Sequence, residues 1–179
     1  MQTCVALLRG INVGGKNRLP MKELRELLTH AGLNNVQTYI QSGNVIFQTD
    51  KTDLVVLTLK VQEVISENFG FKPAVFLLWA NNFLTGIENN PYPEAEEEPK
   101  TLHLFFLSAP PTQADIKKLN ELKKETERFT LKDNVFYLHA PEGIGRSILA
   151  SRAESALGVP VTARNWRTCQ KIKALIEAA

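Results

Sequence analysis

The stretch Val5-Ala-Leu-Leu-Arg-Gly-Ile-Asn-Val-Gly-Gly-Lys-Asn-Arg-Leu-Pro20 sets the pattern for the rest of the chain. It begins as an apolar run, continues as a glycine-rich basic loop and ends at a proline. A short run that is apolar at successive positions is typical of a central strand buried on both faces. Proline is well tolerated in the first turn of a helix. The stretch therefore predicts a strand, a polar loop and a helix.

The first half of the chain continues this alternation. Apolar residues at helical spacing predict helices from Met21 to about Gly32 and from Leu54 to about Gly70. Ser42-Gly43-Asn44 between two β-prone runs indicates a hairpin turn. The remaining strands are predicted at Val36–Ile40, Val45–Phe47 and Ala74–Trp79. The order βαββαβ is that of the ferredoxin-like motif.

The stretch Asn89-Asn-Pro-Tyr-Pro-Glu-Ala-Glu-Glu-Glu-Pro99 interrupts the pattern. It follows a possible short helix at Asn82–Ile87, and its proline and acidic residues are typical of an exposed linker. We therefore expect a first ferredoxin-like half at 1–88, a linker at 89–100 and a second half at 101–179.

The second half repeats the order and adds a final helix capped by Asn165. The sequence thus predicts an α+β protein with two tandem ferredoxin-like halves and antiparallel sheets. The similarity of Gly43–Phe47 to Asp133–Tyr137 suggests an internal duplication. Because Val5–Leu8 and Leu104–Leu107 are apolar on both faces, we expect the open faces to cover each other, or to be covered by the final helix or in a homodimer.

Composition sets limits on the function. The 179 residues are 44% hydrophobic and carry a net charge of +2, which gives no strong overall attraction for nucleic acid or a membrane. No apolar run is long enough to span a bilayer, and we expect no signal peptide. Cys4 and Cys169 are expected to be buried, reduced thiols in a cytoplasmic protein.

The first loop, Gly10-Ile-Asn-Val-Gly-Gly-Lys-Asn17, is one residue short of a P-loop. Its backbone N–H groups and Lys16 are suited to bind a phosphate. A true P-loop is disfavoured, because Asn17 replaces the hydroxyl residue that holds magnesium and a hairpin follows the helix. A connector whose glycines only serve turn geometry remains the alternative to an anion site.

Three further stretches are candidates for a binding site. Gln41-Ser42-Gly43-Asn44 is either a simple turn or a set of donors and acceptors beside the first loop. The loop His139–Ser147 leads into a helix, where Arg146 and Ser147 are placed to contact an anion. Ser147 is alternatively a helix cap, and no third residue supports nucleophilic catalysis by His139 and Ser147.

The third stretch lies near the C-terminus. The spacing of Arg164, Arg167 and Lys171 puts them on one face of the final helix, opposite Trp166 and other apolar residues. The face is either an ordinary solvated surface or a stripe that contacts phosphates. No aromatic residues interleave with it, so the indication of nucleic-acid binding is weak. No cysteine and histidine cluster has metal-ligand spacing.

Three motifs resemble one known family. They are Leu7-Leu-Arg-Gly-Ile-Asn-Val-Gly-Gly-Lys-Asn17, Tyr39-Ile-Gln-Ser-Gly-Asn-Val-Ile-Phe47 and Thr162-Ala-Arg-Asn-Trp-Arg-Thr168. Together they are similar to the bacterial family called domain of unknown function 1697. The resemblance implies two ferredoxin-like halves and brings no reaction, cofactor or ligand with it.

The leading hypothesis is a protein that binds an anionic small ligand, a nucleotide or a phosphorylated metabolite, at the Gly/Lys loop. The alternatives are nucleic-acid binding through the final helix and a protein-interaction module. The candidate ligand-binding residues are Arg9, Asn12, Gly14, Gly15, Lys16, Gln41, Ser42, Asn44, Arg146, Ser147, Arg164, Asn165 and Trp166.

Overall fold

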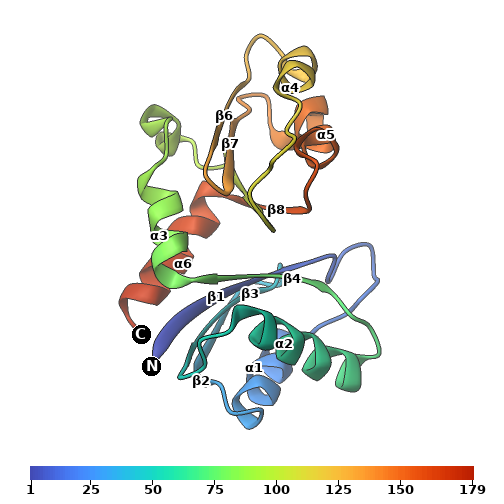
Figure 1. Ribbon diagram of the computed structural model, residues 1–179, viewed down its shortest axis with the longest axis vertical. Helices are drawn as coiled ribbons and strands as arrows, with labels where there is room; N and C mark the ends of the chain where they lie inside the picture. Colours follow the sequence, from blue (N-terminus) through green and yellow to red (C-terminus); the bar gives the residue numbers. More distant parts are fainter. The chain divides into compact units, whose positions relative to one another are not determined.

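The computed structural model describes all 179 residues and divides the chain into two compact units. The first unit comprises Met1–Thr85 with Lys171–Ala179, and the second comprises Gly86–Gln170. The chain passes from one unit to the other within helix α3 (Ala80–Glu88) and again within helix α6 (Trp166–Glu177). Figure 1 shows the course of the chain.

The first unit is a four-stranded sheet covered on one face by two helices (Figure 1). Its elements are β1 (Gln2–Arg9), α1 (Met21–His30), β2 (Asn34–Tyr39), β3 (Asn44–Thr49), α2 (Leu54–Phe69) and β4 (Ala74–Trp79). The strand order is β2-β3-β1-β4, and every pair is antiparallel. Helix α2 begins where Asp53 accepts a hydrogen bond from the backbone N–H of Val55, and it ends at the left-handed Gly70.

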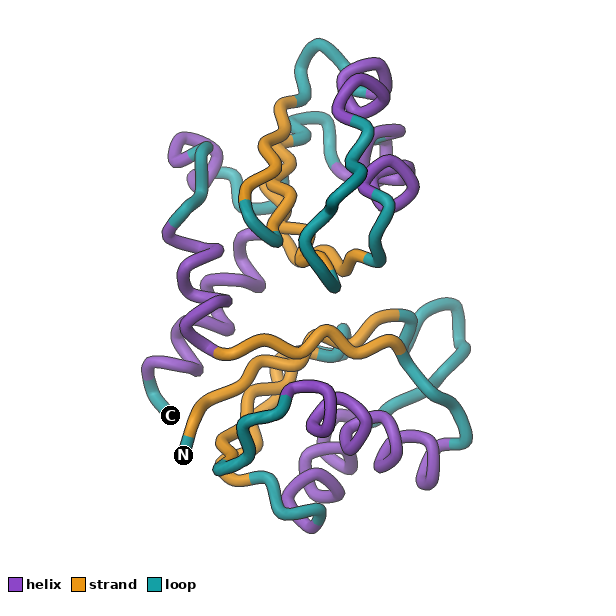
Figure 2. Tube along the Cα trace, in the orientation of Figure 1, coloured by secondary structure: helices purple, strands orange, loops and turns teal.

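The second unit has the same topology. Its elements are η1 (Pro93–Glu97), β5 (Leu102–Leu107), α4 (Ile116–Leu122), β6 (Arg128–Lys132), β7 (Val135–His139), η2 (Ile144–Arg146), α5 (Ile148–Leu157) and β8 (Val161–Asn165). The strand order β6-β7-β5-β8 is again fully antiparallel, and Figure 2 marks its strands in orange. The prediction of two tandem ferredoxin-like halves is therefore confirmed.

Apolar side chains occupy both faces of the central strands. In β1, Cys4, Ala6 and Leu8 pack in a core with residues of α1 and α2. The alternate residues Val5 and Leu7 point to the opposite face of the sheet and are also fully buried. This alternation explains why the sequence of β1 is apolar at every position.

The acidic stretch that was predicted to be an exposed linker is held against strand β6 by side-chain contacts. Tyr92 and Thr130 share a hydrogen bond of 2.8 Å, and the Nζ of Lys132 donates to Asn89 (2.8 Å). Arg128 forms an ion pair with Glu94 and stacks on the Tyr92 ring, 4.6 Å from its centroid. Tyr92 is only 7% exposed. We call residues Asn89–Glu98 the strap.

Candidate functional site

The loop between β1 and α1 is a small β-hairpin. Val13 and Lys16 pair across it, and the backbone N–H of Lys16 donates to the carbonyl of Val13 (3.0 Å). Gly14 and Gly15 lie between them with φ of 58° and 73°. Two left-handed residues at these positions are typical of a tight hairpin turn, which explains the Gly-Gly pair. We call Gly10–Pro20 the basic hairpin.

Asn12 holds the base of the basic hairpin. Its Oδ1 accepts a hydrogen bond from the backbone N–H of Leu19 (2.8 Å). Its Nδ2 donates to the carbonyl oxygens of Leu19 (3.0 Å) and Gln41 (2.8 Å). Asn17 closes the other side by donating to the carbonyl of Gly10 (2.8 Å). These carboxamides therefore fix the shape of the loop and join it to the β2–β3 turn.

The β2–β3 turn packs tightly against the end of β1. The backbone N–H of Leu8 donates to the carbonyl of Gly43 (2.8 Å). A Cβ atom on Gly43 would lie 2.6 Å from the Cβ of Leu8 and 2.7 Å from the Cδ1 of Ile11. Because Gly43 also has a φ of 77°, only glycine fits this position without strain.

Asn44 is fully buried at the start of β3, and its Nδ2 donates to the carbonyl of Tyr39 (3.0 Å) and to the hydroxyl of Ser42 (2.9 Å). The β2–β3 turn lies beside the first loop, as predicted, because Leu7 at the end of β1 pairs with Asn44 at the start of β3. The side chain of Asn44 holds the turn together, so Gln41 is left as an exposed carboxamide beside the hairpin.

The same turn holds a strained apolar residue that the sequence did not indicate. Ile40 has a φ of 49°, which is unusual for a β-branched side chain, and it is 50% exposed. Val13, at the tip of the basic hairpin, is 68% exposed. Backbone strain of this kind is concentrated at functional sites. Exposed apolar side chains therefore occur in both the basic hairpin and the β2–β3 turn.

The basic hairpin and Arg9, the residue before it, carry exposed positive charge. Arg9, Lys16 and Arg18 are all exposed, and neither residues 9–20 nor residues 40–44 include an acidic side chain. No ion pair neutralises Lys16 or Arg18. Arg18 was not among the predicted site residues, although it is the third basic residue within this short stretch.

The second unit shows that this topology forms without a glycine-rich basic loop after its first strand. Its β5–α4 connection, Ser108–Asp115, lies at the equivalent place and contains neither glycine nor a basic residue. Its β6–β7 turn consists only of Asp133 and Asn134. The second unit thus has the same topology with loops that lack the glycines and the positive charges. The glycine pair, the positive charges and the strained Ile40 are specific to the first unit.

At the predicted anion site before α5, the side chain of Ser147 has a structural role. The hydroxyl of Ser147 accepts a hydrogen bond from the backbone N–H of Ala150 (3.0 Å) and is 4% exposed, so it caps the helix. The Nδ1 of His139 lies 3.1 Å from the Nη2 of Arg128. Burial and the Arg128 charge lower the pKa of His139. Arg146 remains exposed in η2.

The prediction that Arg164 lies on the solvent face of the final helix is wrong. Arg164 belongs to β8, where it pairs with Leu104, and it is 8% exposed. Its Nη1 donates to Thr162 (3.0 Å) and to the carbonyl of Ala163 (2.8 Å), and burial lowers its pKa to about 10. The predicted cap is present, since Asn165 accepts from the N–H of Thr168 (2.9 Å).

Three predicted site residues near the C-terminus have structural contacts of their own, namely Arg164, Asn165 and Trp166. Trp166 is 4% exposed at the start of α6, so it does not offer a surface for a ligand. Arg167 and Lys171 are the residues of the predicted basic stripe that lie exposed on α6. The stripe is thus shorter than the spacing suggested.

The rest of the chain offers little other reactive chemistry. Cys4 and Cys169 are buried free thiols, and burial raises the pKa of each to about 12. Thiols with such a pKa are poor nucleophiles at neutral pH. No three histidine, cysteine or carboxylate side chains gather closely enough to hold a metal ion. None of the helices combines the length and the apolar character needed to cross a membrane.

The fold and the site define an α+β protein of two ferredoxin-like halves with a basic hairpin after its first strand. Residues 1–137 match the family model described as "Protein of unknown function (DUF1697)", and the chain belongs to this family. The chain is also similar to a conserved bacterial protein of known structure from Streptococcus pneumoniae, with 26% identity over 98% of each chain and a TM-score of 0.68. No curated protein sequence matches the chain.

Proposed function

We propose that this protein binds a phosphate-bearing ligand at the basic hairpin of the first unit. The observation that carries the proposal is the pair Lys16 and Arg18, which are exposed and without an ion-pair partner on a loop that Asn12 fixes in shape. A fixed loop holds its charges in place before the ligand arrives, which lowers the entropic cost of binding.

We expect side chains to be the main contacts, because two of the backbone amides in the loop are already engaged. The backbone N–H of Asn12 donates to the carbonyl of Asn17 (3.1 Å), and that of Lys16 donates to Val13. These amides are therefore not available to surround a phosphate as they are in a P-loop. Arg18 offers a planar donor pair to phosphate oxygens, whereas Lys16 offers a point charge. Gln41 adds an exposed carboxamide at the edge.

The rival hypothesis, nucleic-acid binding through the final helix, loses one of its three residues. Arg164 lies in β8, so Arg167 and Lys171 alone form the exposed stripe. A phosphate-bearing ligand at the first unit therefore has the stronger support. A single-stranded oligonucleotide belongs among the probes, because it also presents phosphates.

The proposal is tested by titrating pyrophosphate and a labelled single-stranded oligonucleotide against the wild type, Lys16→Met and Arg18→Met. Lys22→Met is the matched control, since Lys22 is exposed on the neighbouring helix α1. We expect each hairpin variant to weaken binding by about tenfold or more, because a charge-assisted hydrogen bond contributes about 1.5–3 kcal/mol. Unfolding should barely change, since exposed substitutions alter stability by about 0.5 kcal/mol or less.

Two results would overturn the proposal. The first is a hairpin variant with reduced stability and unchanged affinity, which would make Lys16 or Arg18 a structural residue. The second is an equal loss of affinity in Lys22→Met, which would show only a general effect of net charge.

A further inference from the structure

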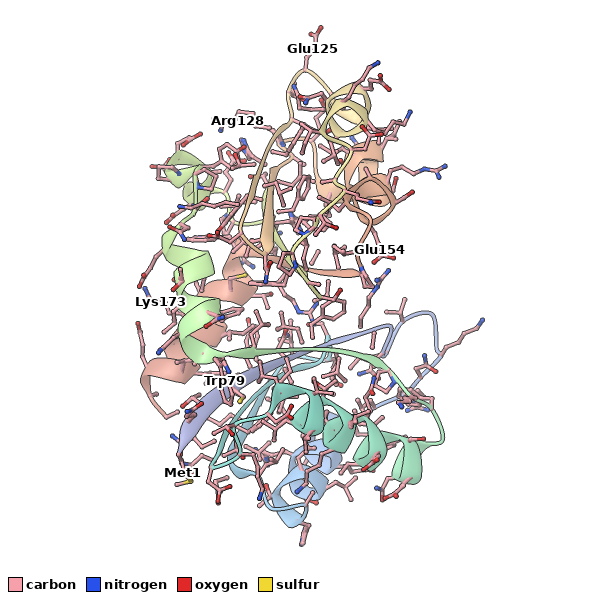
Figure 3. All side chains as sticks on the ribbon, in the orientation of Figure 1. Met1, Trp79, Glu125, Arg128, Glu154 and Lys173 are labelled. Carbon is pink, nitrogen blue, oxygen red and sulfur yellow. The ribbon has the colours of Figure 1, made fainter.

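A second candidate site lies at the other end of β1 from the basic hairpin. An open pocket of about 520 Å³ is formed there by the start of β1, the end of β4, the first turn of α3 and the last turn of α6. All of these segments belong to the first unit. Figure 3 labels Trp79 and Met1, which both line the pocket. The volume falls in the range typical of small-molecule sites.

The pocket has an aromatic wall and neutral polar side chains. Trp79 is partly buried, and it packs against the core of the first unit while it lines the pocket. Gln2, Thr3, Asn81 and Asn82 complete the polar part of the lining, and no side-chain hydrogen bond occupies any of them. No charged side chain lines the pocket. Apart from the N-terminal ammonium of Met1, its donors and acceptors are therefore available and uncharged.

Helix α3 adds further donors. It begins at Ala80, directly after the last residue of β4. The first N–H groups of a helix have no partner within the helix. The backbone amides of Asn81 and Asn82 therefore lie beside the carboxamides of the same two residues.

We propose that this pocket binds a nucleobase that stacks on Trp79 and is recognised at its edge by Asn81 and Asn82. A base presents a flat aromatic face and an edge of neutral donors and acceptors, which an aromatic ring and carboxamides match. A phosphate would meet no positive side chain here, and the N-terminal ammonium of Met1 would be its one cationic partner.

The base belongs either to a free nucleoside or to a single-stranded nucleic acid. In both cases the protein would contact the same base, and only the single strand would bring phosphates with it. A nucleoside leaves affinity independent of salt, whereas a single strand adds a salt-dependent contribution. The inference does not depend on the basic hairpin, because the pocket and the hairpin share no residue.

Intrinsic fluorescence provides the test, because the chain has two tryptophans and Trp166 is only 4% exposed. The full chain is titrated with adenosine, guanosine, cytidine and uridine, and then with single-stranded homopolymers of the same bases. We expect saturable quenching by at least one nucleoside. The signal should vanish in Trp79→Phe, which retains an aromatic ring against the core.

Affinity is then compared by calorimetry in the double variant Asn81→Ala with Asn82→Ala. Both side chains are exposed, so the variant should fold as the wild type does, which a thermal melt checks. We expect binding to weaken about tenfold or more, and Asn34→Ala, an exposed asparagine on β2, to bind as the wild type. Lys16→Met should leave nucleoside binding unchanged, which separates this site from the basic hairpin.

Three results would overturn the inference. The first is that no nucleoside or homopolymer binds saturably. The second is that the folded double asparagine variant binds with the affinity of the wild type. The third is that an uncharged methyl glycoside displaces the bound nucleoside with equal affinity. The last result would assign the pocket to a carbohydrate.

Discussion

The carboxamide of Asn12 pairs with both backbone groups of Leu19, as a neighbouring strand would. The Oδ1 accepts from the N–H of Leu19 (2.8 Å), and the Nδ2 donates to its carbonyl (3.0 Å) and to that of Gln41 (2.8 Å). Asn12 itself has a φ of 53°, a conformation that asparagine tolerates better than most residues. One side chain thus fixes both the base of the basic hairpin and its position beside the β2–β3 turn.

Asn12→Asp tests this role, because aspartate has the same shape and lacks the two donors. The carbonyls of Leu19 and Gln41 would then face a carboxylate. We expect the free energy of unfolding to fall by about 2 kcal/mol or more, as measured by urea denaturation. Asn34→Asp is the control, since Asn34 is exposed. Equal losses in the two variants would show that Asn12 has no special role.

Gly43→Ala should be far more costly than Gly70→Ala. Both glycines are left-handed, with φ of 77° and 73°, so both variants lose about 1 kcal/mol through backbone strain. Only at Gly43 would the new Cβ meet Leu8 at 2.6 Å and Ile11 at 2.7 Å, whereas nothing lies within 4 Å at Gly70. We expect an additional loss of about 1–3 kcal/mol at Gly43. Similar melting temperatures for the two variants would contradict this packing.

His103 should make stability depend on pH. It is 8% exposed in β5, its Nδ1 has no hydrogen-bond partner, and burial lowers its pKa to about 4. Between pH 6.5 and pH 4 the unfolded chain binds a proton that the folded chain does not bind. Stability is therefore complete above pH 6.5 and falls as the pH is lowered, by roughly 3 kcal/mol at pH 4 and below.

His103→Leu should remove this dependence and leave stability at pH 7 nearly unchanged or higher, because an unpartnered polar atom is lost from the interior. Urea denaturation of the wild type and the variant at several pH values between 4 and 7 measures the difference. A constant difference across this range would show that His103 does not titrate as inferred.

The strap should be held less firmly when Arg128 is replaced by methionine, although the Tyr92–Thr130 and Lys132–Asn89 hydrogen bonds remain. Arg128 joins Glu94, Tyr92 and His139, so its loss removes an ion pair, a stacking contact and a hydrogen bond at once. We expect a protease that cuts after glutamate to cleave within Glu94–Glu98 several-fold faster in Arg128→Met, as followed by mass spectrometry. The proposed division at 89–100 predicts that the first cuts fall there in the wild type as well.

Lys118→Met is the control for this experiment, because Lys118 is exposed and pairs only with Glu121 on its own helix. If the first cuts instead fall within α4 or α5, the division of the chain at the strap is incorrect.

Local patterns in the sequence determined the elements and their order. The continuous apolar run of β1 and the helical spacing of α1 depend only on neighbouring residues, and the βαββαβ order then limits the topology. The cap of α6 by Asn165 was also visible, because a cap joins residues three positions apart. The place of the basic hairpin after the first strand followed from the same local patterns.

The tertiary structure decided which polar residues remain free to bind a ligand. Asn12 looked like a ligand-binding amide, yet it donates to the carbonyl of Gln41, which only the fold brings near it. Asn44 instead bonds within its own turn, to Tyr39 and Ser42. The sequence placed Arg164 on the final helix, whereas in the structure it pairs with Leu104 and belongs to β8. Burial and hydrogen-bond partners depend on contacts between distant segments, so residue spacing does not encode them. Lys16 was already a candidate from the sequence, whereas only the fold added Arg18 as a second exposed cation of the same loop.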